Sequence, residues 1–322
     1  MRHLHYILAA VIFCTAGCAG TACYKPRHAI PDEGLIEIAG VPAFQQEKNQ
    51  CGPAALASML SWSGIMVKPD DLLEHVYDPA KEGSLQISLV AAARRYGRVA
   101  YEVYGMEELS EELSAGYPVL VLMNKGLSWW PVHHYAVVCG FDSTGRRLLL
   151  AGGNACKEYL SVRSFKHMWS RDDNWGLLVL PPGKLPETVT KNRWLEAVYG
   201  LERAGLHEAA FTGYCTALEK WPEDQGALMG KANTLYALGE LEHAAKVLVE
   251  AAEIYPESGP VFNNLANVML ELGNTDMALK AALKAVDTGG MHLPVYRKTL
   301  ERVHGTMESG KNKRIDDEKH GR

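Results

Sequence analysis

The sequence of 322 residues lacks several features that would assign it to common functional classes. Its seven cysteines form no Cys-x-x-Cys pair and no Cys/His cluster at metal spacing, so we predict neither a zinc site nor a cofactor. The 33 basic residues are fewer than the 38 acidic ones, and without a basic field nucleic acid is an unlikely class of partner. After the N-terminal region, no apolar stretch is long and uncharged enough to span a bilayer.

The composition is otherwise that of an ordinary globular protein, with 47% apolar and 22% charged residues. Single domains typically contain about 100–200 residues, so this length predicts about two domains. The motifs below divide the chain accordingly.

The N-terminus has the layout of an export signal. A short basic segment that contains Arg2 precedes the apolar run Ile7–Phe13. This run is too short to cross a bilayer as a stable helix. The following Thr-Ala-Gly-Cys, which ends at Cys18, resembles the lipobox of bacterial lipoproteins, although threonine stands where an aliphatic residue is usual. This resemblance implies a signal peptide over residues 1–17 and lipidation of Cys18.

Residues 18–34 are then expected to form a tether. By analogy with lipoprotein sorting, Ala19 after the lipidated cysteine implies the periplasmic face of the outer membrane. A second, weaker lipobox ends at Cys23, and an ordinary secretory signal is the alternative. All three interpretations place the protein in the cell envelope or beyond.

A repeat of 34 residues occupies the C-terminal part of the chain. Four columns recur at this spacing: Gly205, Gly239 and Gly273; Ala210, Ala244 and Ala278; Ala217, Ala251 and Ala285; and Pro222 and Pro256, with Gly290 in the third place. A bulky column contains Trp194, Leu228 and Phe262. Glycine permits a tight turn between two helices, alanine permits their close approach, and proline ends the second helix.

These columns are the positions of tetratricopeptide repeats, so we predict an all-α solenoid over residues 191–290. An unrelated helical bundle is the alternative. Such solenoids usually bind a protein partner or an extended peptide on a concave face. Residues 291–322 are predicted to form a final helix and a charged tail, which we expect to be solvated and disordered from Arg302 onward.

Cys51 is the candidate nucleophile. A polar loop precedes it, and the apolar, alanine-rich segment that follows has helical periodicity. Cys51 would therefore lie at the start of a helix, where a thiolate is stabilised and where Pro53 is tolerated. The alternative is a small buried cysteine before a helix.

A base for this thiol must come from elsewhere in the fold. Residues 119–123 and 131–142 are predicted to form buried strands, and His133 and His134 open the second one. Adjacent strand residues point to opposite faces, so only one of them can serve a given thiol. The pattern alone does not choose between them.

Two motifs together resemble a known family. Gln-x-x-x-x-Cys-Gly-Pro-Ala-Ala-Leu-Ala, from Gln46, and His-Tyr-Ala-Val-Val-x-Gly-Phe-Asp, from His134, resemble double-glycine leader peptidases and their lipoprotein-borne relatives. The resemblance implies an α+β papain-like cysteine peptidase domain at residues 35–182, followed by a linker at 183–190. It also implies that His134 is the base, with His133 as the fallback. The oxyanion-hole glutamine would be Gln46, or alternatively Gln45.

The third catalytic residue departs from the family pattern. An Asp-Pro is expected in the strand after the histidine, but residues 148–154 contain no aspartate. Asn154 is our candidate for orienting the imidazole, and a turn asparagine is the alternative. A Cys/His dyad without a third residue, or an inactive remnant, also stays open.

The sequence thus predicts an envelope-anchored cysteine peptidase that cleaves a peptide or protein recruited by its repeats. One alternative is an inert adaptor that binds proteins through the repeats. Another is a thiol-dependent acyl transferase, because the same thioester intermediate reacts with amines. Trp129 and Trp130 either line a substrate groove near His134 or contribute to packing.

Overall fold

The computed structural model describes residues 34–152 and 157–320, with side chains as far as Ser309. The predicted signal peptide and the lipidation site Cys18 lie outside these residues.

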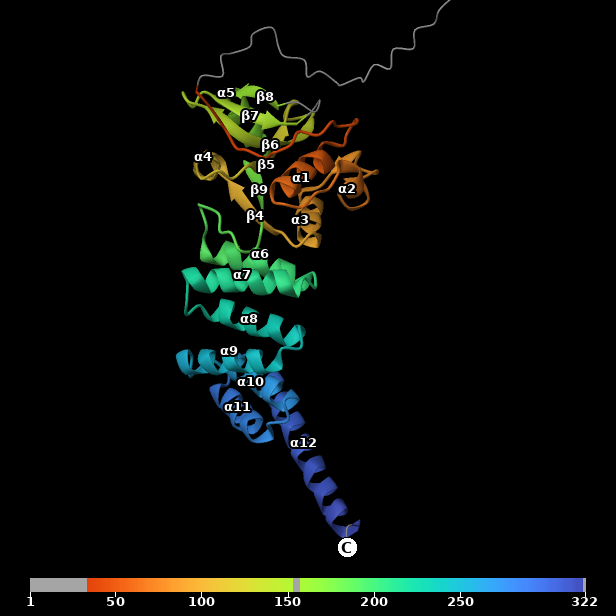
Figure 1. Cartoon of the computed structure of the whole chain (residues 1–322), viewed down its shortest axis with the longest axis vertical. Coiled ribbons are helices and arrows are strands. Elements are labelled where there is room, and N and C mark those ends of the chain that lie inside the picture. Colours follow the sequence, from red (N-terminus) through yellow and green to blue (C-terminus); the bar gives the residue numbers. More distant parts are fainter. Residues whose placement is uncertain (1–33, 153–156, 321–322) are drawn as a thin grey trace, which may run out of the picture. The chain divides into compact units, whose positions relative to one another are not determined.

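An antiparallel sheet forms the centre of the N-terminal part of the chain (Figure 1). Among the described residues it has seven strands, in the order β4-β9-β5-β6-β7-β8, with β1 paired to β6. The strands are β1 (Leu35–Glu37), β4 (Val99–Tyr104), β5 (Val119–Asn124), β6 (His133–Asp142), β7 (Arg147–Ala151), β8 (Lys157–Ser161) and β9 (Trp175–Leu180). The predicted strands at 119–123 and 131–142 correspond to β5 and β6, which confirms both predictions.

The central strands are buried on both faces. All six residues of β5 and all six of β9 are buried, and this explains their continuous apolar sequences. Helices and a small hairpin surround the sheet: α1 (Cys51–Trp62), α2 (Pro69–Val76), α3 (Gln86–Arg95), α4 (Gly105–Ser114), α5 (Val162–Trp169), the 3₁₀-helix η1 (Ser170–Asp172), and β2 (Tyr77–Asp78) paired with β3 (Gly83–Ser84). Of these elements, α1 has the most extensive contact with β6.

Seven helices follow: α6 (Lys191–Arg203), α7 (His207–Lys220), α8 (Gln225–Ala237), α9 (Leu241–Ile254), α10 (Gly259–Glu271), α11 (Thr275–Thr288) and α12 (Leu293–His320). The first six begin at intervals of 34 residues within each alternating set: Lys191, Gln225 and Gly259, and then His207, Leu241 and Thr275. They pack as successive helical hairpins. The repeat that was predicted from spacing is therefore present as structure.

The repeat columns have the predicted physical roles. Gly205, Gly239 and Gly273 each adopt a positive φ, between 74° and 81°, in the turn inside a hairpin. The six alanines of the two alanine columns are completely buried, which permits the close helix packing. Trp194 and Leu228 are also buried, whereas Phe262 is half-buried.

The expected disorder of the tail is wrong within the described residues, because α12 continues to His320. Tyr296, Thr299 and Val303 are buried, and α12 packs on α11 and α10. This packing nucleates the helix. The lysine-, arginine- and glutamate-rich sequence that follows consists largely of good helix formers, and α12 continues through it.

The segment between β9 and α6 is fixed by hydrogen bonds. The fully buried carboxylate of Glu112, on α4, accepts hydrogen bonds from the backbone N–H groups of Glu187 and Thr188 and from the Thr188 hydroxyl. The hydroxyl of Tyr101, on β4, donates to the Thr188 carbonyl and accepts from the Thr190 N–H. Hydrogen bonds thus hold the predicted linker against the sheet-containing part of the chain. Trp194 of α6 also belongs to the same buried cluster as residues of β4 and β9.

Candidate active site and repeat groove

The Cys51 thiol lies at the first residue of α1. The backbone N–H groups of Tyr135, Gly52 and Cys51 itself lie close enough to its sulfur to favour the thiolate. Burial raises the pKa of the Cys51 thiol, and these N–H groups, with the charge of Lys125, offset part of that increase. The thiol is therefore protonated at neutral pH. The proximity of the Tyr135 N–H, together with the packing of α1 on β6, places the sulfur near the start of β6.

His134 is the second residue of β6 and directly precedes Tyr135. Burial, with a smaller effect of Lys125, lowers the pKa of His134 to about 4, so its imidazole is neutral at pH 7. Among the described residues, no side chain forms a hydrogen bond or an ion pair with this imidazole. Cys51 and His134 are thus both neutral at pH 7, and not a thiolate and an imidazolium.

Gln46 lies against the sheet near Gly152. A Cβ atom built on Gly152 would be 3.2 Å from the Ala136 Cβ and 3.8 Å from the Gln46 Nε2. Ala136 lies two residues after His134 and therefore on the same face of β6. Gln45 is exposed, whereas Gln46 is half-buried. The structure thus places the amide of Gln46 near the strand that carries His134, while its role in an oxyanion hole stays a prediction.

His133, and not His134, has an acidic partner, which lies outside the strand where the sequence pattern predicts one. Its Nε2 is 3.1 Å from Asp172 Oδ1, in η1. Burial raises the pKa of Asp172, and the contact with His133 offsets part of that increase. Sequence reasoning missed both Asp172 and Lys125. No motif marks either residue, and only the tertiary structure brings them to the start of β6.

Asn154 and the two other cysteines of this part of the chain remain to be placed. Asn154 and Cys156 lie in the segment 153–156, outside the described residues, so the orienting role of Asn154 stays a prediction. Cys139 is buried in β6, its Sγ is 3.6 Å from the Leu149 carbonyl oxygen, and burial raises its pKa to about 11. Cys139 is therefore a core residue.

The described part of the chain contains no cluster of three or more His, Cys, Asp or Glu side chains that could hold a metal ion. The helices in that part are also too short or too polar to cross a membrane.

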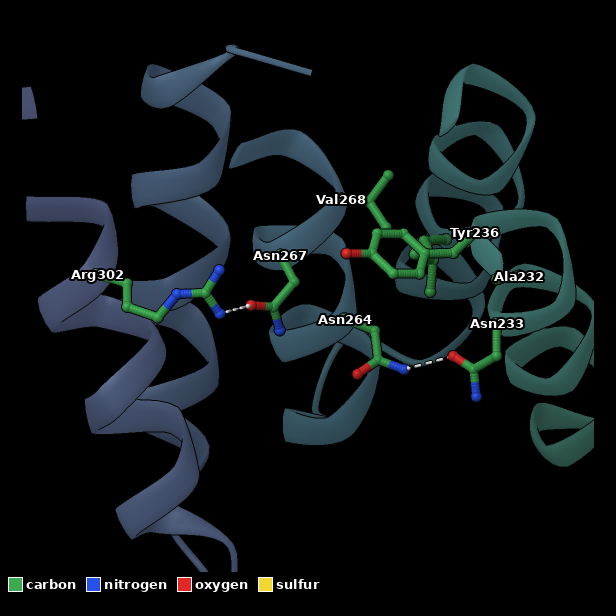
Figure 2. A pocket seen from close by; sticks show the side chains of 8 residues that line it. Ala232, Asn233, Tyr236, Asn264, Asn267, Val268 and Arg302 are labelled. Atoms are coloured by element: carbon green, nitrogen blue, oxygen red, sulfur yellow. Dashed lines mark hydrogen bonds between the residues drawn. The ribbon is translucent and has the colours of Figure 1, made fainter. Parts of the chain in front are cut away.

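A second candidate site is a groove on the repeats (Figure 2). It has a volume of about 280 Å³ and is lined mainly by side chains of α8, α10 and α12, namely Asn233, Tyr236, Asn264, Asn267, Val268 and Arg302. Asn264 Nδ2 donates to Asn233 Oδ1 over 3.1 Å, and Arg302 Nη1 donates to Asn267 Oδ1 over 3.1 Å. Asn233 and Asn267 occupy the same column of successive repeats, so the repeat itself brings amide groups to this surface.

Comparison with known proteins finds a family model that matches the region of the first of these sites. Residues 38–173 match the Peptidase_C39 like family. The match includes Gln46, Cys51, His133 and His134, and it ends just after Asp172. No curated protein is significantly similar to the chain.

Solved structures resemble both parts of the chain. The peptidase domain of a bifunctional Streptococcus ABC transporter of a quorum-sensing pathway is 23% identical, with a TM-score of 0.38 over 44% of this chain and 98% of that one. A putative C39-like peptidase from Bacillus anthracis is 18% identical, with a TM-score of 0.39 over 47% and 98%. The Sgt2 TPR domain from Aspergillus fumigatus is 19% identical, with a TM-score of 0.36 over 41% and 85%.

The fold class predicted from the sequence is confirmed. A C39-like α+β domain that contains the sheet precedes a run of helices that resembles a tetratricopeptide solenoid.

Proposed function

We propose that the C39-like domain is a cysteine peptidase in which Cys51 is the nucleophile and His134 is the base. The observation that carries this proposal is the position of the Cys51 thiol. It lies at a helix N-terminus and close to the backbone N–H of Tyr135, directly after the family's histidine position. This arrangement suits proton transfer from a thiol to a neighbouring imidazole.

The reaction begins with transfer of the Cys51 proton to neutral His134. The thiolate then attacks the scissile carbonyl carbon, and the Cys51 N–H and the Gln46 amide donate hydrogen bonds to the oxyanion. When this intermediate collapses, the peptide nitrogen takes the proton from His134 and leaves as an amine. Water, deprotonated by His134, hydrolyses the remaining thioester and restores the thiol.

The repeat groove supports the second part of the proposal, that the solenoid recruits the substrate or another protein. Asn233, Asn267 and Arg302 present amide and guanidinium groups beside the apolar Val268 and the ring of Tyr236 (Figure 2). Polar groups of this kind bind the main chain of an extended segment, while the apolar surface contacts its side chains.

We further propose that the protein is held in the cell envelope by a lipid on Cys18, at the periplasmic face of the outer membrane. The sequence around Cys18 supports this proposal. Mass spectrometry of the mature N-terminus tests it. A free cysteine, or cleavage at another position, would show that Cys18 is not the lipidated residue.

An inert, protein-binding adaptor is the second candidate. It is favoured by the absence, among the described residues, of a side-chain partner for His134, and by the raised pKa of the Cys51 thiol. Acyl transfer is a third candidate, which addition of an amine and mass analysis of the products distinguish from hydrolysis.

The deciding experiment is hydrolysis of unfolded casein by the full chain, followed by mass spectrometry of the products. We expect wild-type activity to be lost in Cys51→Ser and in His134→Ala, and kept in Cys139→Ser, the matched cysteine control. Equal activity in Cys51→Ser would refute the nucleophile. If no variant is active but the repeats bind proteins, the adaptor is the correct interpretation.

A further inference from the structure

An exposed apolar hairpin tip lies between β5 and β6, next to the candidate active site. Leu127, Trp129, Trp130 and Val132 are 52%, 77%, 69% and 50% exposed. The two indole rings contact each other edge to face, with their centroids 6.3 Å apart. Large apolar side chains that are exposed together on one short segment are characteristic of contact surfaces.

Hydrogen bonds hold this tip in one conformation. Leu127 and Trp130 exchange two backbone hydrogen bonds of 3.0 and 3.1 Å. The buried Asn124 side chain accepts from the N–H groups of Gly126 and Val132, over 2.9 and 3.0 Å. A side chain on Gly126 would collide with the backbone of Trp130 and Val132. The two tryptophans are therefore presented by a rigid support, and a partner pays little entropy to bind them.

A second element fixes the hairpin from outside. The guanidinium of Arg171, in η1, donates to the Gly126 carbonyl, and the neighbouring Asp172 pairs with His133 directly after the hairpin. The contacts of Arg171 and Asp172 thus connect the tip and the start of β6 to the same short 3₁₀-helix. These contacts do not bury the indole rings, and both tryptophan side chains remain mostly exposed.

The hairpin is continuous with the catalytic pair at both of its ends. Its last residue precedes His133 and His134 in the chain. Its first residue, Lys125, acts electrostatically on both Cys51 and His134, so the charge of Lys125 lies within range of both groups. The tip is therefore joined directly to the start of β6, which carries the proposed base, and we expect an extended peptide bound there to reach it.

We propose that Trp129 and Trp130, with Leu127 and Val132, form a subsite for apolar side chains of the peptide substrate. This inference rests on the proposed peptidase function and adds a substrate class to it: peptides with leucine- or phenylalanine-like residues beside the cleaved bond. The tip offers aromatic and aliphatic surface, while its own backbone N–H groups are largely committed to the hairpin. Selection by this surface therefore depends on side-chain apolarity.

Binding to the full chain carrying Cys51→Ser tests the subsite without turnover. The probes are two fluorescein-labelled octapeptides, one with two leucines and one phenylalanine and the other with serine and glutamine at those positions. We expect the apolar peptide to bind at least tenfold more tightly. Trp129→Ala or Trp130→Ala, each added to Cys51→Ser, should weaken its binding about tenfold or more. Phenylalanine at either position should retain most of the affinity.

Met66→Ala is the control, because Met66 is 90% exposed on the loop that follows α1, at the opposite end of that helix from Cys51. It should leave the affinity unchanged. Equal binding of both peptides, or no effect of the tryptophan substitutions, would overturn the subsite. So would a blue shift of tryptophan emission with phosphatidylglycerol vesicles but not with the apolar peptide, because it assigns the tip to a lipid surface.

The same peptides separate this inference from the catalytic proposal. If they bind in a tryptophan-dependent way but wild-type enzyme does not cleave them or casein, the peptidase function fails and the contact surface stands. If casein is cleaved in a Cys51-dependent way but neither tryptophan affects peptide binding or cleavage, the subsite fails and the peptidase stands.

Discussion

At the residue scale, the protonation states of Cys51 and His134 decide how this site can react. The thiol has a raised pKa and the imidazole a pKa of about 4, so both groups are neutral over most of the physiological range. A preformed thiolate–imidazolium pair requires the opposite order of the two pKa values. Proton transfer in this site therefore belongs to the attack step, and it costs more than in a preformed ion pair.

This order predicts the pH dependence of peptide hydrolysis. At pH values well above its lowered pKa, His134 is neutral and can act as a base. We therefore expect kcat/KM to stay level from about pH 5.5 to 8. It should fall as pH decreases through about 4, where His134 becomes protonated. The measurement is a profile of kcat/KM at constant ionic strength. An acidic limb near pH 6.5 would show that His134 is solvated or bears an acidic partner.

The neighbouring histidine supplies the control. His133 pairs with Asp172, and its substitution by alanine should leave the acidic limb in place, whereas His134→Ala should abolish activity. The opposite result would make His133 and Asp172 the working pair and move the base by one residue.

Gln46 and Gln45 allow a matched test of the oxyanion hole. Gln46→Ala should reduce kcat about 100- to 1000-fold with little change in KM, because the lost hydrogen bond forms to the oxyanion and not to the ground-state carbonyl. Gln45→Ala should leave kcat unchanged, since Gln45 is exposed. Steady-state kinetics on a single peptide measures both. Equal effects of the two substitutions would place neither amide in the oxyanion hole.

The sequence predicted the positions of Cys51, His134 and Gln46 because each belongs to a motif whose spacing is local. It could not predict Lys125 or Asp172, since their proximity to β6 depends on how the hairpin and η1 fold over the strand. The strand pattern alone did not choose between the two histidines, and the choice of His134 came from the family resemblance and stays a prediction. Alternation along a strand assigns them to opposite faces, but only the structure shows that His133 has an acidic partner.

At the element scale, the repeat was predictable in detail because each column has one physical role. Glycine in a left-handed turn, alanine at a helix contact and proline after a helix recur at 34 residues and need no tertiary information. The final helix was not predictable in the same way. Its charged sequence suits both a helix and a disordered tail, and the packing of Tyr296 and Val303 decides the outcome.

Alanine substitution of two glycines should change the free energy of unfolding in opposite directions. Gly239 has a φ of 81° and open space around the Cβ position, so Gly239→Ala should destabilise by about 1–2 kcal/mol through backbone strain alone. Gly305 lies in α12 with open space around it, and Gly305→Ala should stabilise the helix by about 1 kcal/mol. Urea denaturation measures both changes. If both variants shift in the same direction, backbone conformation is not the cause.

At the scale of the whole described chain, the C39-like domain and the first repeat are joined by buried contacts and not by a free linker. Trp194 and Val198 of α6 share a buried cluster with the sheet, and Arg193 forms a bidentate pair with Glu108 of α4. The sequence predicted a short proline-containing linker at residues 183–190. It gave no sign that Glu112, a residue on an amphipathic helix, bonds to that linker from a fully buried position.

Glu112→Ala tests this junction. The substitution leaves the N–H groups of Glu187 and Thr188 and the Thr188 hydroxyl without their acceptor, in a buried environment where each lost hydrogen bond to a charged group costs about 1.5–3 kcal/mol. We expect the wild-type C39-like domain and first repeat to unfold in one calorimetric transition. In Glu112→Ala this transition should move to lower temperature. Glu111→Ala, at the adjacent exposed position, should leave it unchanged. If Glu112→Ala unfolds like the wild type, the linker bonds contribute nothing to the coupling, and Trp194 and the shared core must hold the two parts together alone.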